Sequence, residues 1–150
     1  MRRISPKIGI ILAAVVMFAL TAAPPARAVR LASAEPGAGA YFEITDVTGE
    51  RFVVKLTDPA KIQHARDLVS GTTTSEPHLI GRLIPRPVPY NPRWGYHYNP
   101  DTVGFFDMAI EVCDATIPYV EEHLDEAGGA FLPGYIWCPW SSRVIREVSG

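Results

Sequence analysis

The chain of 150 residues is long enough for one domain, and it carries 14 basic against 16 acidic side chains. Residues 1–28 hold four of the basic side chains and none of the acidic ones, so the remainder has a net charge near −6 with histidine neutral. This acidic balance argues against a nucleic-acid partner, because binding to a phosphate backbone needs clustered Lys and Arg, and against attachment of the domain to anionic lipid.

Residues 1–28 are typical of a signal peptide. A basic start leads into an uncharged apolar run, residues 8–23, which is followed by two prolines. Ala26-Arg27-Ala28 then fits the small-x-small pattern of a cleavage site. The apolar run is shorter than the roughly 20 residues that a membrane-spanning helix needs. We therefore expect the protein to be secreted or otherwise exported across the plasma membrane, with membrane contact only if this segment stays uncleaved.

Residues 29–40 are predicted to be a flexible leader, because their Ala, Gly, Ser and Pro side chains bury little surface. Residues 41–149 are then the single folded domain. Apolar and polar side chains alternate at its start over residues 41–47 and 51–57. Since Thr48-Gly49-Glu50 has turn composition, these two runs are predicted to pair as an antiparallel hairpin.

A first helix is predicted to begin after Asp58. The aspartate side chain can accept hydrogen bonds from the free amides of the first turn, and Pro59 at the first helical position loses no hydrogen bond. Gly71 is typical of a helix end, since glycine adopts the left-handed conformation without strain. Residues 78–84 are a third strand candidate.

Residues 85–101 form a loop with five prolines and a row of aromatic side chains. Structureless loops of this length are uncommon in compact domains and are often functional. We predict that this loop presents a binding surface, joined by two tryptophans near the C-terminus. The residues of this predicted surface are Tyr90, Trp94, Tyr96, His97, Tyr98, Trp137 and Trp140. The alternative is that the loop folds over the core and that its rings fill gaps there.

Residues 103–129 change their periodicity from that of a strand to that of a helix. Side chains alternate up to Cys113, and from Asp114 the apolar positions follow a helical spacing that ends at two glycines. Residues 141–148 are predicted to be a last strand. The order β-β-α-β-loop-β-α-β predicts an α+β domain, with a mainly antiparallel sheet of about five strands and two helices packed on one face.

The two cysteines, Cys113 and Cys138, are predicted to form a disulfide after export. The alternative is a pair of buried thiols. Their spacing is too long for a C-x-x-C redox or zinc motif.

Metal and cofactor binding have little support in the sequence. The four histidines are scattered without a zinc spacing, and the acidic second helix lacks the ligand spacing of a calcium loop, so we expect no metal and no cofactor. A hydrolase that uses His97, Asp101 and Ser141 or Ser142 can be assembled on paper, but no G-x-S-x-G elbow is present. We therefore expect no catalytic residue, and a non-catalytic domain is the favoured prediction.

Three runs in the chain resemble the N-terminal domain of the calmodulin-binding "BP seventy-four" family, and they cover most of residues 52–148. They are FVVKLTDPAKIQHARDLVSG, PYNPRWGYHYNPDTVGFFDMAIEVCDATIPYVEEHLDEAGGAFLPG and WCPWSSRVIREV. The resemblance implies calmodulin as a partner and brings no assigned site residue with it. Calmodulin targets are usually basic amphipathic helices, whereas the first predicted helix has mixed charge and the second is acidic.

The sequence as a whole predicts a small exported non-catalytic binding module whose partner is an unknown protein or small ligand. Two alternatives remain at this point. One is a secreted hydrolase, and the other is a protease-inhibitor-like domain that presents the proline-rich loop to an enzyme cleft.

Overall fold

The computed structural model describes residues 39–109 and 112–150. The predicted signal peptide and nearly all of the predicted leader lie outside these residues, although Ala40, the last leader residue, already begins a strand. Within the described ranges, the structure contains no helix that is long and apolar enough to cross a membrane.

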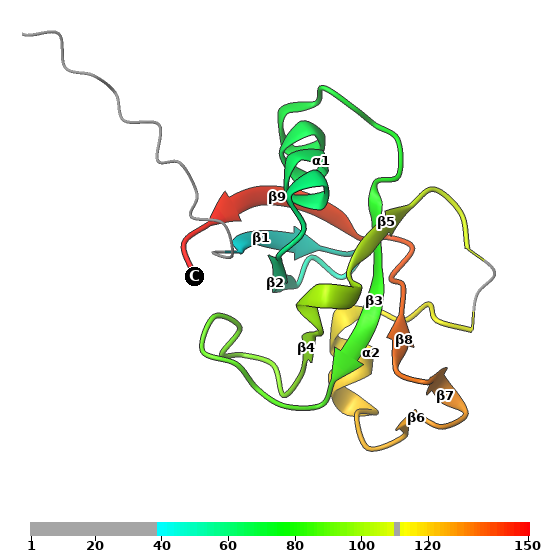
Figure 1. Cartoon of the computed structure of the whole chain (residues 1–150). Helices are drawn as coiled ribbons and strands as arrows, with labels where there is room; N and C mark the ends of the chain where they lie inside the picture. Colours follow the sequence, from blue (N-terminus) through cyan, green and yellow to red (C-terminus); the bar gives the residue numbers. More distant parts are fainter. Residues whose placement is uncertain (1–38, 110–111) are drawn as a thin grey trace, which may run out of the picture. The chain divides into compact units, whose positions relative to one another are not determined.

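The described chain folds into short strands, two α-helices and one 3-10 helix (Figure 1). In chain order they are β1 (Ala40–Thr45), β2 (Arg51–Leu56), α1 (Pro59–Ser70), β3 (His78–Ile84), β4 (His97–Tyr98), the 3-10 helix η1 (Pro100–Thr102), β5 (Gly104–Phe106), α2 (Ile117–Glu122), β6 (Ala127–Gly128), β7 (Phe131–Pro133), β8 (Ile136–Trp137) and β9 (Arg143–Val148). Strands dominate and pair mainly in antiparallel fashion, which confirms the predicted α+β class.

The strands form three sheets where one sheet of about five strands was expected. The first has the order β2-β1-β9, and a β-bulge between Glu43 and Ile44 interrupts the pairing of β1 with β9. The second is built on β3, along which β5, β8 and β4 pair in turn with successive stretches of two or three residues. The third is the short parallel pair of β6 and β7. The sheet is divided because β3 meets three short strands and never pairs with β1 or β2.

The β1–β2 hairpin and helix α1 confirm their predictions. Gly49 has a φ of 79° in the hairpin turn, a conformation that glycine adopts without strain. The Asp58 side chain accepts a hydrogen bond from the amide of Ala60 at 2.8 Å, and Gly71 ends α1 with a φ of 76°. Helix α1 packs against β9 and β2, as Figure 1 shows.

Residues 103–129 contain less regular structure than their periodicity predicted. Strand β5 ends at Phe106, and beyond it Met108 and Val112 are 81% and 74% exposed. Ile110, predicted to lie between them on the same strand face, is outside the described residues. Helix α2 begins only at Ile117, after Thr116, because Asp114 does not cap it: the Asp114 carboxylate instead accepts the amide of Trp140 at 2.9 Å.

The core draws on the first two sheets, on both helices and on Leu132 of β7. Helix α1 contributes Ala65, and helix α2 contributes Ile117 and Val120. The largest fully buried side chains are Trp137, Tyr96, Tyr98, Phe42, Phe52, Ile44, Leu56, Leu79, Leu83, Ile117, Leu132 and Val54. Tyr96 and Tyr98 of the proline-rich loop are among these buried side chains, so the loop does not present their rings to a ligand.

Candidate functional site

The predicted aromatic surface is not formed as an exposed surface. Trp94, Tyr96, His97, Tyr98 and Trp137 are all buried, with no more than 5% of any of them accessible. The remaining two members, Tyr90 and Trp140, are partly buried. The rings instead pack against one another in the core, so the alternative interpretation of the loop, in which its rings fill the interior, describes the fold. Among these contacts, Phe52 meets Tyr96, Tyr98 and Trp137 at ring-centroid distances of 5.0, 6.0 and 5.4 Å.

The proline-rich loop is held along the outer edge of β2. The indole N–H of Trp94 donates to the carbonyl oxygen of Arg51 at 2.7 Å, and the side-chain oxygen of Asn91 accepts the amide of Val53 at 3.1 Å. These side chains satisfy backbone groups that an edge strand would otherwise leave open. The loop thus covers the β2 edge of the first sheet, which would otherwise be open to pairing with another strand.

The buried phenols have structural roles. The hydroxyl of Tyr96 donates to the carbonyl oxygen of Ile117 at 2.8 Å. Burial raises the pKa of Tyr96, and the nearby carboxylates of Glu121 and Asp46 raise it further. Burial likewise raises the pKa of Tyr98 well above its ordinary value. Both phenols therefore stay protonated at neutral pH and serve as hydrogen-bond donors.

The residues of the hydrolase alternative each bond to a different partner. His97 Nδ1 lies 2.6 Å from the carbonyl oxygen of Arg86, and Asp101 accepts the hydroxyl of Thr57 at 3.3 Å. The hydroxyl oxygen of Ser142 accepts the amide of Leu79, and that of Ser141 accepts the amide of Val47. The structure therefore does not bring these groups together as a triad.

Cys113 and Cys138 are joined by a disulfide, as predicted, with their Cα atoms 5.1 Å apart. The amide of Cys138 also donates to the carbonyl oxygen of Cys113 at 2.8 Å. The bond links the segment before α2 to the end of β8.

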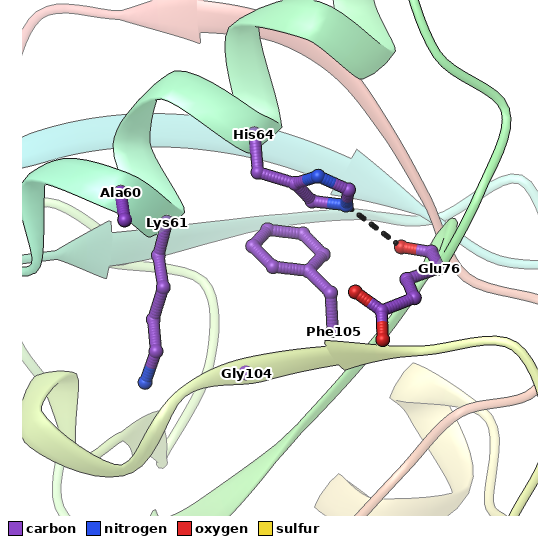
Figure 2. Close-up of a pocket in the computed structure, with 6 residues that line it drawn as sticks. All are labelled: Ala60, Lys61, His64, Glu76, Gly104 and Phe105. Carbon is purple, nitrogen blue, oxygen red and sulfur yellow. Dashed lines mark hydrogen bonds between the residues drawn. The ribbon is translucent and has the colours of Figure 1, made fainter.

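A pocket of about 350 Å³ lies between α1 and β5, and no residue of the predicted surface lines it. Figure 2 shows its lining side chains, which come from three parts of the chain. They are Ala60, Lys61 and His64 of α1, Glu76 before β3, and Gly104 and Phe105 of β5.

Glu76 is fixed in this pocket through its backbone. Its φ is 47°, a left-handed conformation that costs a non-glycine residue roughly 1–2 kcal/mol. Two side chains hold it there: Asp107 accepts the Glu76 amide at 2.6 Å, and His64 Nε2 lies 3.2 Å from the Glu76 carbonyl oxygen. Since a carbonyl oxygen can only accept, Nε2 carries the proton. Backbone strain of this kind tends to occur at binding and catalytic sites.

An aromatic floor and two opposite charges characterise the pocket. The rings of His64 and Phe105 meet edge to face with centroids 4.8 Å apart. Lys61 and Glu76 extend on opposite sides of Phe105 in Figure 2. Across residues 39–109 and 112–150, neither charge takes part in an ion pair. Both are thus available to a ligand.

In the part of the chain that the structure describes, no three His, Cys, Asp or Glu side chains lie close enough together to hold a metal ion.

None of the pocket residues was among the predicted site residues. One local signal existed, because Lys61 and His64 are three residues apart and therefore share a face of α1. The other side of the pocket depends on long-range pairing. Phe105 lies opposite Leu79 in the β3–β5 ladder, a register that the sequence alone does not reveal.

Comparisons with known proteins give one positive result. The family model described as the "BP seventy-four" N-terminal domain matches residues 38–150. No curated protein and no solved structure matches the chain. The family match covers the whole described fold, including the pocket and the disulfide, and confirms the resemblance seen in the sequence. The chain belongs to the "BP seventy-four" N-terminal domain family.

Proposed function

We propose that this domain is a small exported non-catalytic binding module whose ligand site is the pocket between α1 and β5. The observation that carries the proposal is the combination, in one place, of a concave surface, two aromatic rings and two opposite charges that form no ion pair among the described residues. Ligand sites in proteins are concave and mostly apolar, with a few polar groups that orient the ligand. A volume of about 350 Å³ is near the small end of such sites, so the ligand is a small molecule or a short piece of a larger one.

The pocket is also built on supported elements. Lys61 and His64 come from a capped helix and Phe105 from a paired strand. The backbone of Glu76, which lies between α1 and β3, is held by His64 and Asp107. A site that is already in place before binding loses little entropy when the ligand arrives.

Export follows from the signal-peptide pattern and is part of the proposal. The Cys113–Cys138 disulfide supports it, because disulfides persist in oxidising compartments and are rare in the cytosol. A ligand for this pocket is therefore to be sought outside the cytosol.

The test is a screen of small molecules by NMR, in which backbone amide shifts of the purified protein report where each compound binds. We expect the bound compounds to move the amides of α1, Glu76 and β5. Ala60→Met should weaken binding, because Ala60 lines the pocket and the longer side chain would extend over it. Gln63→Met is the matched control, since Gln63 is exposed on the same helix and bonds to Asp67 outside the pocket. Equal effects of the two variants, or shifts confined to other parts of the domain, would contradict the proposal.

A further inference from the structure

We propose that the ligand of this pocket is a small zwitterion, with an ammonium group at Glu76, a carboxylate at Lys61 and an apolar middle over Phe105. The inference rests on the proposed function, because it names the ligand class of the same site. Amino acids whose ammonium and carboxylate stand at opposite ends of a carbon chain share this chemistry, as do very short peptides.

The Glu76 end suits a cation. Its carboxylate has no ion-pair partner among the described residues, and Asp107, which bonds to the Glu76 amide, places a second carboxylate nearby. Phe105 lines the same pocket, and aromatic rings attract cations through the negative charge of their faces. An ammonium group also has several donors that a carboxylate can accept.

The Lys61 end suits an anion. The amides of the first turn of α1 are already occupied by Asp58, which bonds to Ala60 and Lys61. The Lys61 side chain is therefore the donor that remains for a ligand at this end of the pocket. Because it extends on the opposite side of Phe105 from Glu76, one molecule reaches both charges only if its own charges are separated by an apolar stretch (Figure 2).

The exposure of the two charged side chains sets the expected affinity. Lys61 is partly buried and Glu76 is exposed, so each ion pair with a ligand stays partly hydrated. Pairs of that kind contribute up to about fivefold in affinity each. A zwitterion should therefore bind more tightly than its singly charged relatives by about that factor, and more tightly than a neutral relative by the product of both factors.

The experiment compares four molecules that share one six-carbon chain: 6-aminohexanoate, hexanoate, hexylamine and hexan-1-ol. Each is titrated into the purified protein, and the amide shifts of the pocket residues give its dissociation constant. We expect 6-aminohexanoate to bind most tightly and hexan-1-ol most weakly. The shorter 4-aminobutanoate, the longer 8-aminooctanoate, leucine and a dipeptide then distinguish free amino acids from peptides and other spacings.

Two variants, each of which removes one charge, test the two ends of the pocket separately. Lys61→Met should weaken 6-aminohexanoate about fivefold and leave hexylamine unchanged, whereas Glu76→Gln should weaken 6-aminohexanoate and leave hexanoate unchanged. Lys55→Met and Glu122→Gln are the matched controls, because neither residue lines the pocket. If hexan-1-ol binds at the pocket as tightly as 6-aminohexanoate, the zwitterion inference is overturned while the binding-module proposal stands. If no probe moves the pocket amides while other compounds of the screen do, the zwitterion inference alone is overturned. If no compound of the screen moves them either, both are overturned.

Discussion

The Asp46 carboxylate accepts the backbone amide of Ile117 at 2.6 Å and thereby caps the first turn of α2 from the β1–β2 turn. The helix has no cap of its own, because the side chain of Thr116 makes no capping hydrogen bond. Asp46 is only 2% exposed, and its other oxygen accepts the amide of Thr48 at 2.9 Å. One buried carboxylate therefore joins the first hairpin to the last helix.

Replacement of Asp46 by alanine should lower the free energy of unfolding by about 1–3 kcal/mol. The change removes the helix cap and leaves the amides of Ile117 and Thr48 without their acceptor. Urea unfolding followed by circular dichroism measures the loss. Asp125→Ala serves as the control, because Asp125 is an exposed acid beyond the end of α2. Equal losses in the two variants would show that Asp46 is not a cap.

The two helices show which parts of the fold the sequence could predict. Asp58 and Gly71, which begin and end α1, lie next to the helix in the chain, so local capping rules found both. The cap of α2 lies 71 residues away in sequence, and no local pattern points to it. The helical spacing of apolar residues after Asp114 correctly predicted that Ile117 and Val120 lie on the buried face of a helix. It predicted a longer helix than the one that forms.

The aromatic loop and the pocket show the same limit for the site. Composition correctly marked the loop as unusual, but it could not decide between an exposed surface and a buried one, because tyrosine and tryptophan suit both. Hydrogen bonds from Trp94 and Tyr96 to distant backbone carbonyls decide it. The pocket, in turn, needs β3 to pair with β5 before Phe105 can face α1.

Trp94→Phe should destabilise the domain by about 1–3 kcal/mol, because phenylalanine leaves the carbonyl oxygen of Arg51 without its donor. Trp94→Ala should cost about 3–5 kcal/mol, since it also removes a buried ring. Both are measured by chemical unfolding. Trp140→Phe is the matched control, because the indole N–H of Trp140 has no hydrogen-bond partner within the described ranges. A loss in Trp140→Phe as large as that in Trp94→Phe would assign the effect to ring size alone.

Loss of the disulfide should lower stability by roughly 3 kcal/mol, because the bond closes a loop with a sequence separation of 25 residues in the unfolded chain. The double variant Cys113→Ala, Cys138→Ala and the reduced wild type should unfold at similar urea concentrations. Reductant should leave the double variant unchanged, which controls for its other effects. Two reactive thiols in the denatured but unreduced wild type would contradict the bond.

The ion pair between Arg66 and Glu147 should make a small, pH-dependent contribution to stability. Arg66 donates to both carboxylate oxygens, at 2.8 and 2.7 Å, and this hydrogen bonding lowers the pKa of Glu147 below its ordinary value. A carboxylate with a lowered pKa stabilises the fold above its unfolded-state pKa of about 4.3, and the benefit is lost as pH falls through the lower folded-state value. Both side chains are more than 40% exposed, so solvent limits the contribution to at most about 1 kcal/mol.

Urea unfolding of the wild type and Glu147→Gln at neutral and acidic pH measures that contribution. The wild type should be the more stable protein at pH 7, and the difference should shrink as the pH falls below 4 and as salt screens the pair. Glu122→Gln is the control, since Glu122 is exposed and takes part in none of the ion pairs found in the described residues. A difference that persists unchanged at low pH would mean that the effect does not come from the charge of Glu147.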